Sequence, residues 1–192
     1  MKLPEPRAKG EVSLEETLMR RHSVRRFTSA GLSWEQVSQL LWAAQGMVEG
    51  RYRFRTAPSA GAVYPLEVYL VTCEGIYHYQ SQGHELEEIL KGDVRPQLCR
   101  AALSQEWIEE APIDIVITAH YHRMETEYGE RASRYVHMEA GHTAQNIHLQ
   151  AVALGLGSVP IGAFHDGQVQ KALSLPQDHE PLYIVPVGYP MK

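Results

Sequence analysis

The sequence has no long apolar run and no apolar leader. Its longest charge-free apolar stretch, residues 146–164, is broken by His148, Gln150, Pro160 and several glycine or serine positions, which makes it too polar to cross a membrane. Residues 1–16 lack the apolar core that a secretory signal needs. From these absences we expect a cytoplasmic protein with no membrane partner.

Cysteine is also scarce. Cys73 and Cys99 lie far apart, and their spacing matches neither a CxxC redox pair nor a metal-binding cluster. We therefore expect two buried, reduced thiols and no redox dithiol.

The net charge of −5 is spread unevenly along the chain. Residues 1–55 hold ten Lys and Arg against six Asp and Glu, whereas residues 56–192 hold eight against 17. This basic excess is too small and too local for a general nucleic-acid binder. It suits one anionic group, such as a phosphate, because the basic part is rich in arginine.

The length of 192 residues and the hydrophobic content of 44% predict one domain, residues 1–192, of the α+β class with a mixed sheet. Residues 113–119 are apolar at nearly every position, so we expect this strand at the centre of the sheet. Further strands are predicted at residues 66–73, 76–80 and 182–188. Helices are predicted to begin near Ser13, Ser33, Asp93, Ser104, Tyr135 and Asp166.

The segment RRHSVRRF, residues 20–27, places Arg21, Ser23 and Arg25 at alternate positions. In an extended chain these side chains leave on one side. Two guanidinium groups and a hydroxyl form a receptor for a phosphate and the polar edge of a planar ring. Taken alone, the segment fits a solvated basic turn equally well.

Two further segments combine rigid prolines with small residues. In RTAPSAGAVYP, residues 55–65, small side chains around Gly61 would let a flat ligand lie against the backbone. In VPIGAF, residues 159–164, Pro160, Gly162 and Ala163 repeat this combination. Each segment alone fits an ordinary turn next to a strand.

Together and in this order, the three segments resemble the FMN-dependent nitroreductase superfamily, and within it the SagB-type dehydrogenase branch most of all. EAGHTAQNIHLQAVALGLGSVPIGAF, residues 139–164, and LYIVPVGYP, residues 182–190, extend the resemblance to about residues 18–190. It implies a nitroreductase-like α+β fold with a mixed, mainly antiparallel sheet flanked by helices. It also implies a two-fold homodimer with one FMN at each of two subunit-interface sites.

The same resemblance assigns the flavin contacts to the three segments. The phosphate, ribityl chain and pyrimidine edge fall to Arg21, His22, Ser23 and Arg25. The other subunit contributes Pro58, Ser59, Ala60 and Gly61. The isoalloxazine ring near its N5 atom lies along Pro160, Ile161, Gly162 and Ala163. Arg25 is the candidate for stabilising the reduced, anionic flavin, and a backbone N–H of Gly162 or Ala163 is the candidate donor to N5.

Two departures from the family pattern concern the C-terminal segment and the acid/base pair. Many nitroreductases place a further basic residue after the last strand to bind the phosphate, and here Lys192 alone could play that part. Azoline-forming relatives use a Lys-Tyr pair, which we place in ETEYGERASRY, residues 125–135. There Tyr128 is kept and Glu127 replaces the lysine, so Tyr128 is the candidate catalytic residue and peptide azoline oxidation is disfavoured.

Histidine spacing offers little support for a metal site. His120 with His122, and Glu139 with His142, have usable spacings, but a di-iron bundle needs a second Glu-x-x-His motif and more inward carboxylates. Hydrogen-bonded or surface histidines explain these residues better. We predict no metal.

The expected function is therefore that of an FMN-dependent oxidoreductase with a ping-pong cycle. NAD(P)H reduces the flavin and leaves, and an acceptor such as a nitroaromatic or a quinone takes its place. One alternative is a SagB-type dehydrogenase that oxidises azoline-containing or other peptide-derived substrates. Another is a flavin-binding module or redox subunit without turnover, and a third, single-strand nucleic-acid binding through the arginine-rich segments, is disfavoured by the charge distribution.

Overall fold

The computed structural model describes residues 1–48 and 54–191. Its helices are α1 (Leu14–Arg20), α2 (Trp34–Gln45), α3 (Arg95–Ala101), α4 (Trp107–Glu110), α5 (Tyr121–Tyr128), α6 (Ala132–Ala153) and α7 (Asp166–Ala172), with short 3₁₀ turns η1 (Ala60–Ala62) and η2 (Gly129–Arg131). Its strands are β1 (Leu66–Thr72), β2 (Gly75–Gln80), β3 (Glu85–Lys91), β4 (Ile113–Ala119), β5 (Gly157–Ser158) and β6 (Glu180–Gly188).

The six strands form one sheet in the order β3-β2-β1-β4-β6-β5. Neighbouring strands are antiparallel, and an isolated bridge between Ser23 and Ser158 adds a parallel component. β4 lies between β1 and β6 and is buried at every position, as its apolar sequence predicts.

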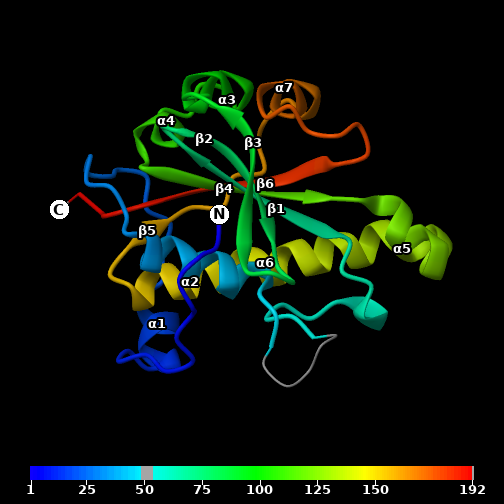
Figure 1. Cartoon of the computed structure of the whole chain (residues 1–192), viewed down its shortest axis with the longest axis horizontal. Helices are drawn as coiled ribbons and strands as arrows, with labels where there is room; N and C mark the ends of the chain where they lie inside the picture. Colours follow the sequence, from blue (N-terminus) through cyan, green and yellow to red (C-terminus); the bar gives the residue numbers. More distant parts are fainter. Residues whose placement is uncertain (49–53, 192) are drawn as a thin grey trace.

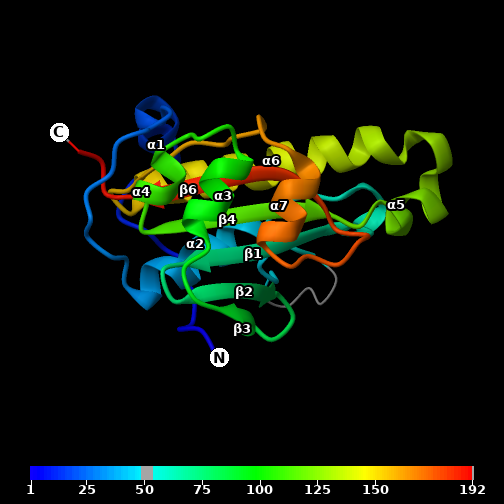
Figure 2. The ribbon, with the colours of Figure 1, turned by 90° about the horizontal axis from the view of Figure 1, so that it is seen from above.

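Helices cover both faces of the sheet (Figure 1). α2 and α6 lie on one side, and α3, α4 and α7 lie on the other. The core beneath α2 and α6 contains Leu40, Leu66 and Ile115, whereas Val116 and Ile184 face the opposite layer. α6 is the longest helix and runs along the sheet (Figure 2), and its small residues allow α2 to pack closely against it.

Capping residues define the starts of the first two helices as predicted. Ser13 caps α1 by accepting a hydrogen bond from the Glu16 N–H. Ser33 and Gln36 form a complete capping box at α2. At α3 the cap residue is Val94, one residue later than predicted, although Asp93 accepts a hydrogen bond from the Arg95 N–H at 3.0 Å and also pairs with the Arg95 side chain.

Three elements differ from the sequence prediction, and one of them, α5, has no counterpart in it. β3 is an edge strand in which only Leu86 is buried, so its charged residues hide the alternating pattern. α6 begins at Ala132 rather than Tyr135, because η2 and the preceding α5 lead directly into it. Among the helices described, none combines the length and apolarity required to span a bilayer.

Candidate functional site

The segment Arg21–Arg25 lies beside β5 in an extended conformation. The Val24 N–H donates to the Ser158 carbonyl at 3.0 Å. A Cβ on Gly157 would lie 2.6 Å from the Val24 side chain, so glycine permits this close approach. Val24 therefore faces the sheet, and Ser23 and Arg25 on either side of it are exposed. Exposure does not alternate along the whole segment, because His22 is exposed as well and Arg21 is half-buried.

Arg21 and Arg25 lack a carboxylate partner among the described residues. Their neighbour Arg20, by contrast, forms an ion pair with Glu16 at 2.7 Å. The Arg25 guanidinium lies 5.7 Å from the ring centroid of Trp107. This cation–π contact holds the positive charge of Arg25 near α4. Two guanidinium groups without a counter-charge form a receptor for an anion.

A buried histidine on α6 bonds to Ser158, the β5 residue beside which Arg21–Arg25 lies. His148, on α6, is 4% exposed, and its Nδ1 lies 2.8 Å from the Ser158 hydroxyl. Burial lowers the pKa of His148 to about 4, and the charges of Arg21 and His22 add to this effect. His148 is therefore neutral at neutral pH and adds no positive charge to the phosphate receptor; sequence reasoning gave it no role.

The segment Pro160–Ala163 continues from β5 toward α7. Ile161 is buried, and both of its backbone groups bond to Ile184, so it cannot offer a hydrogen bond to a ligand. Gly162 and Ala163 are exposed. The Gln105 side chain donates to the Ala163 carbonyl at 2.9 Å and fixes this turn.

We call the first group of residues the arginine half. It consists of Arg21, His22, Ser23, Arg25, Pro160, Gly162 and Ala163. His22 is exposed, and its Nδ1 donates to the Arg20 carbonyl at 2.9 Å. Lys192, the remaining predicted phosphate contact, lies outside the described residues.

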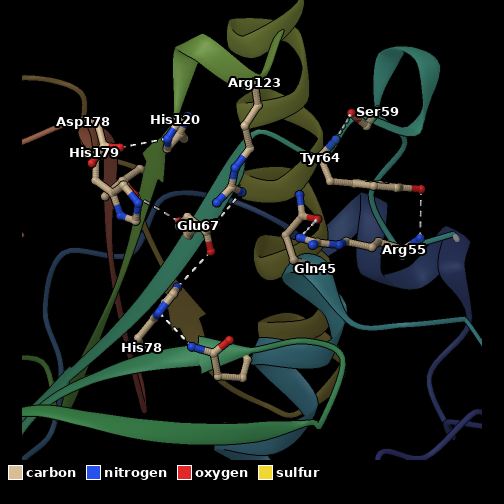
Figure 3. A network of polar contacts seen from close by, with 12 residues as sticks. Gln45, Arg55, Ser59, Tyr64, Glu67, His78, His120, Arg123, Asp178 and His179 are labelled. Atoms are coloured by element: carbon tan, nitrogen blue, oxygen red, sulfur yellow. Dashed lines mark hydrogen bonds and ion pairs between the residues drawn. The ribbon is translucent and has the colours of Figure 1, made fainter. Parts of the chain in front are cut away.

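A second group, the loop half, consists of Pro58–Gly61 and Tyr128. Gly61 has a φ of 60°, and a Cβ there would lie 2.5 Å from Tyr128 Oη. The candidate catalytic tyrosine therefore lies directly over the loop. The Ser59 hydroxyl accepts a hydrogen bond from the Tyr64 N–H at 2.9 Å (Figure 3), which holds the loop in a tight turn. Ala60 packs against the core, and Pro58 is exposed.

Behind this loop lies a buried carboxyl. Glu139, on α6, is 1% exposed, and its Oε1 accepts a hydrogen bond from Gln45 at 3.3 Å. Burial raises the pKa of Glu139 to about 7, although the Ser59 hydroxyl, the Gln45 amide and the Arg55 charge act in the opposite direction. Its Oε2 has no hydrogen-bond partner in the part of the chain described. Sequence reasoning considered Glu139 only as a metal ligand.

A polar network fixes α5, the helix that carries Tyr128. Glu67 on β1 lies between His78, at 2.9 Å, and Arg123 of α5 (Figure 3). Burial of Glu67 favours a higher pKa, but the His78 hydrogen bond and the Arg123 charge outweigh it and lower the pKa to about 2. Next to them, His120 pairs with Asp178 at 2.8 Å.

The two halves lie at opposite ends of α6. β5 lies beside the C-terminal end of the helix, whereas η1, drawn in cyan, lies near the α5 end (Figure 1). The turned view in Figure 2 shows the same separation. A single chain therefore brings Tyr128 to Gly61, and Arg21–Arg25 to β5, but the two groups lie apart within it.

A cavity of about 760 Å³ lies elsewhere, between residues 7–14, α2 and α6. It contains none of the predicted site residues, and the charged side chains that line it, Arg7, Lys9 and Glu11, are exposed. In the described ranges, no three His, Cys, Asp or Glu side chains are arranged to hold a metal ion.

Comparison with known proteins gives consistent matches over nearly the whole chain. The sequence profile described as "Nitroreductase family" matches residues 18–189. The chain is 44% identical over 184 residues to the Methanocaldococcus jannaschii protein MJ1384, which carries a provisional nitroreductase name; the match covers 93% of this chain and 91% of that protein.

Solved structures agree with the sequence matches. A provisionally named nitroreductase from Ralstonia eutropha JMP134 has a TM-score of 0.90 and 32% identity, with 100% of this chain and 90% of that chain covered. The NADPH:FMN oxidoreductase from Vibrio harveyi, complexed with NAD⁺, has a TM-score of 0.69 and 24% identity. The match covers 93% of this chain and 69% of that chain. The latter similarity shows a shared fold.

Proposed function

Because this chain belongs to the nitroreductase family and is thus an oxidoreductase, we propose that it binds FMN and uses NAD(P)H to reduce a small acceptor, such as a nitroaromatic or a quinone. The observation that carries this proposal is the arginine half. There, Arg21 and Arg25 have no carboxylate partner among the described residues, and their segment bonds to Ser158 of β5, which leads directly to the exposed Gly162 and Ala163.

The residues present fit an FMN. Arg21 supplies charge-assisted donors for a phosphate, Arg25 supplies them for the pyrimidine edge, and the exposed Ser23 hydroxyl supplies a donor and acceptor for the ribityl chain. A Cβ at Gly162 would meet only the Tyr183 ring, at 3.7 Å, so the backbone there is open to a planar group.

When bound, FMN supplies the hydride and electron transfer. The chain's own residues bind and orient the reactants. The Arg25 guanidinium would stabilise negative charge on the pyrimidine edge, and the N–H groups of Gly162 or Ala163 would donate to the central ring. On the loop half, Tyr128 Oη is positioned over Gly61 as a candidate proton donor to the acceptor.

We further propose that two chains complete each site. The separation of the two halves along α6 supports this, because the loop half of one chain can complete the arginine half of another in a two-fold dimer. Pro58–Gly61 would then lie against a flavin that is held by the partner.

Cofactor binding is tested by purification and titration. The protein is expected to be yellow and to retain FMN. Loss of a charge-assisted contact to the pyrimidine edge in Arg25→Ala should weaken FMN affinity by roughly 10- to 100-fold. Arg26→Ala, which removes an exposed neighbouring charge, should change the affinity little. A colourless protein that takes up no FMN, or equal affinities in the two variants, would contradict the proposal.

Turnover is tested by stopped-flow reduction of the bound flavin with NADH or NADPH, followed by reoxidation with a nitroaromatic or a quinone. We expect at least one of the two nucleotides to bleach the absorbance of the bound flavin, and the acceptor to restore it. If flavin binds but neither nucleotide reduces it, the function is instead that of a peptide-directed SagB-type dehydrogenase or of a flavin-binding module.

A further inference from the structure

The Arg25 side chain is exposed, yet it has a defined neighbour. Its guanidinium carbon lies over the ring of Trp107, 5.7 Å from the ring centroid. An arginine side chain is long and has many rotamers, so a ligand that needs it in one position has to offset the entropy of ordering it. A contact that already holds the guanidinium in place lowers this cost.

Trp107 is itself held in place, although α4 is only a single turn of helix. Its side chain packs against the core layer that contains Val116 and Ile184. The next residue, Ile108, is fully buried. The ring under the guanidinium is therefore part of the core and does not depend on the exposed surface for its position.

The turn before Trp107 is also bonded to the other segment of the arginine half. The Gln105 side chain donates to the Ala163 carbonyl at 2.9 Å. The His165 N–H donates to the Ala101 carbonyl, also at 2.9 Å. Two hydrogen bonds thus fix α4 and its preceding turn relative to the exposed backbone that is proposed to lie along the flavin ring.

The indole N–H of Trp107 indicates what the ring contributes. Its Nε1 is buried and has no hydrogen-bond partner within the described ranges. A buried donor without an acceptor destabilises a fold, and a phenyl ring at this position would avoid that loss. Indole exceeds phenyl in another property, because its face attracts a cation more strongly. The cation over that face is Arg25.

We propose that Trp107 is a positioning residue, which holds the Arg25 guanidinium at the pyrimidine edge of the flavin; this rests on the proposed function. A cation–π contact uses the face of the ring and leaves the N–H donors of the guanidinium free. Arg25 can therefore keep its tryptophan while it donates to an anionic edge. Because α4 is tied to Ala163 as well, Trp107 also sets the spacing between Arg25 and the backbone along the ring.

The first test needs no flavin. ¹H–¹⁵N spectra of the flavin-free full chain are recorded at mildly acidic pH, and the Arg25 Nε–H signal is identified by its absence from Arg25→Ala. We expect a ring-current shift of this signal that disappears in Trp107→Leu and persists in Trp107→Phe. Trp34→Leu, the same change at an exposed tryptophan of α2, is the control and should leave the signal unchanged. A signal that ignores Trp107→Leu would overturn the proposal.

The second test measures the affinities for oxidised and reduced FMN, whose ratio sets the midpoint potential of the bound flavin. Trp107→Leu should weaken the oxidised form by about 3-fold and the reduced, anionic form by about 15-fold, because the reduced form depends more on the Arg25 charge. This fivefold difference lowers the midpoint potential by about 20 mV, since a tenfold change is about 30 mV for a two-electron couple. Trp107→Phe should keep most of both affinities, and Trp34→Leu should keep both.

A double variant separates positioning from support of the fold. If Trp107 acts through Arg25, Trp107→Leu should change neither affinity in an Arg25→Ala background. Losses of equal size in both backgrounds would show that Trp107 supports the fold alone, which would overturn the proposal.

The outcomes distinguish this proposal from the proposed function. If FMN binds and a nucleotide reduces it, but Trp107→Leu keeps the wild-type affinities, the positioning role is wrong and the proposed function stands. A chain that takes up no FMN overturns both, and the absorbance spectrum of the purified protein shows this before any variant is compared.

Discussion

Gly61 is the residue at which the loop half depends most on backbone geometry. Its φ of 60° lies in the left-handed region, and the place that a Cβ would take is occupied by Tyr128 Oη at 2.5 Å. Glycine is therefore required twice, once for its backbone angle and once for the contact with a residue 67 positions later. The sequence singled out both residues, but their contact could not be predicted, since it depends on where α5 packs.

Substitution of Gly61 should separate these two requirements. Gly61→Ala should lower the free energy of unfolding by about 1–2 kcal/mol from its backbone angle alone, with a further loss from the clash with Tyr128. Gly155→Ala is the control, because Gly155 also has a positive φ, 72°, but nothing within 4 Å of its Cβ position. Denaturant unfolding measures both variants.

The clash itself is tested by a double variant. In a Tyr128→Phe background the nearest ring carbon lies 3.4 Å from the added Cβ, so Gly61→Ala should cost no more than Gly155→Ala. An equal cost of Gly61→Ala with and without the tyrosine hydroxyl would contradict the contact.

At the scale of elements, α5 is held to the sheet by charge. Glu67 of β1 bonds to Arg123 of α5 and to His78 of β2, and it has its pKa lowered to about 2. A carboxyl with a lowered folded-state pKa stabilises the fold above its unfolded-state pKa, and this stability is lost as the pH falls through its folded-state pKa. The window for Glu67 therefore runs from about pH 4.5 down to about 2.

Glu67→Gln should remove this contribution. We expect a loss of about 1–3 kcal/mol at pH 7, a flatter stability curve between pH 4.5 and 2, and faster amide exchange in α5. Denaturant unfolding over pH and hydrogen-exchange mass spectrometry measure these effects. Glu88→Gln is the control, because the ion pair that Glu88 forms with Lys91, at 3.7 Å, is exposed to solvent. If both variants behave alike, the network does not hold α5.

Comparison of the helices and strands with their predictions shows which of them a local sequence pattern can identify. α2 and β4 were predictable, because a capping box and a continuous apolar run are local signals. β3 was missed because only Leu86 in it is buried, and α5 because it is short and mostly polar, with an apolar face of only Tyr121, Met124 and Tyr128. The polar partners of Glu67 and Glu139 come from distant elements, so their pKa shifts could not be predicted locally.

At the scale of the whole molecule, the predicted α+β nitroreductase fold is confirmed by the antiparallel sheet, by the family profile and by the relatives. The three segments that carried the resemblance separate into two groups at opposite ends of α6. The sequence alone does not show this separation, because it depends on the direction of α6. The assembly of one site from two chains remains a proposal.

Subunit complementation tests this central claim most directly. Arg25→Ala damages the arginine half and Gly61→Val damages the loop half, so each pure variant should bind FMN weakly. If sites form between chains, a mixed dimer has one doubly damaged site and one intact site. After the two variants are unfolded and refolded together, random pairing should restore tight FMN binding at about a quarter of all sites. Titration of the mixture that shows no tight sites, while each variant alone is folded and dimeric, would contradict a site shared between chains.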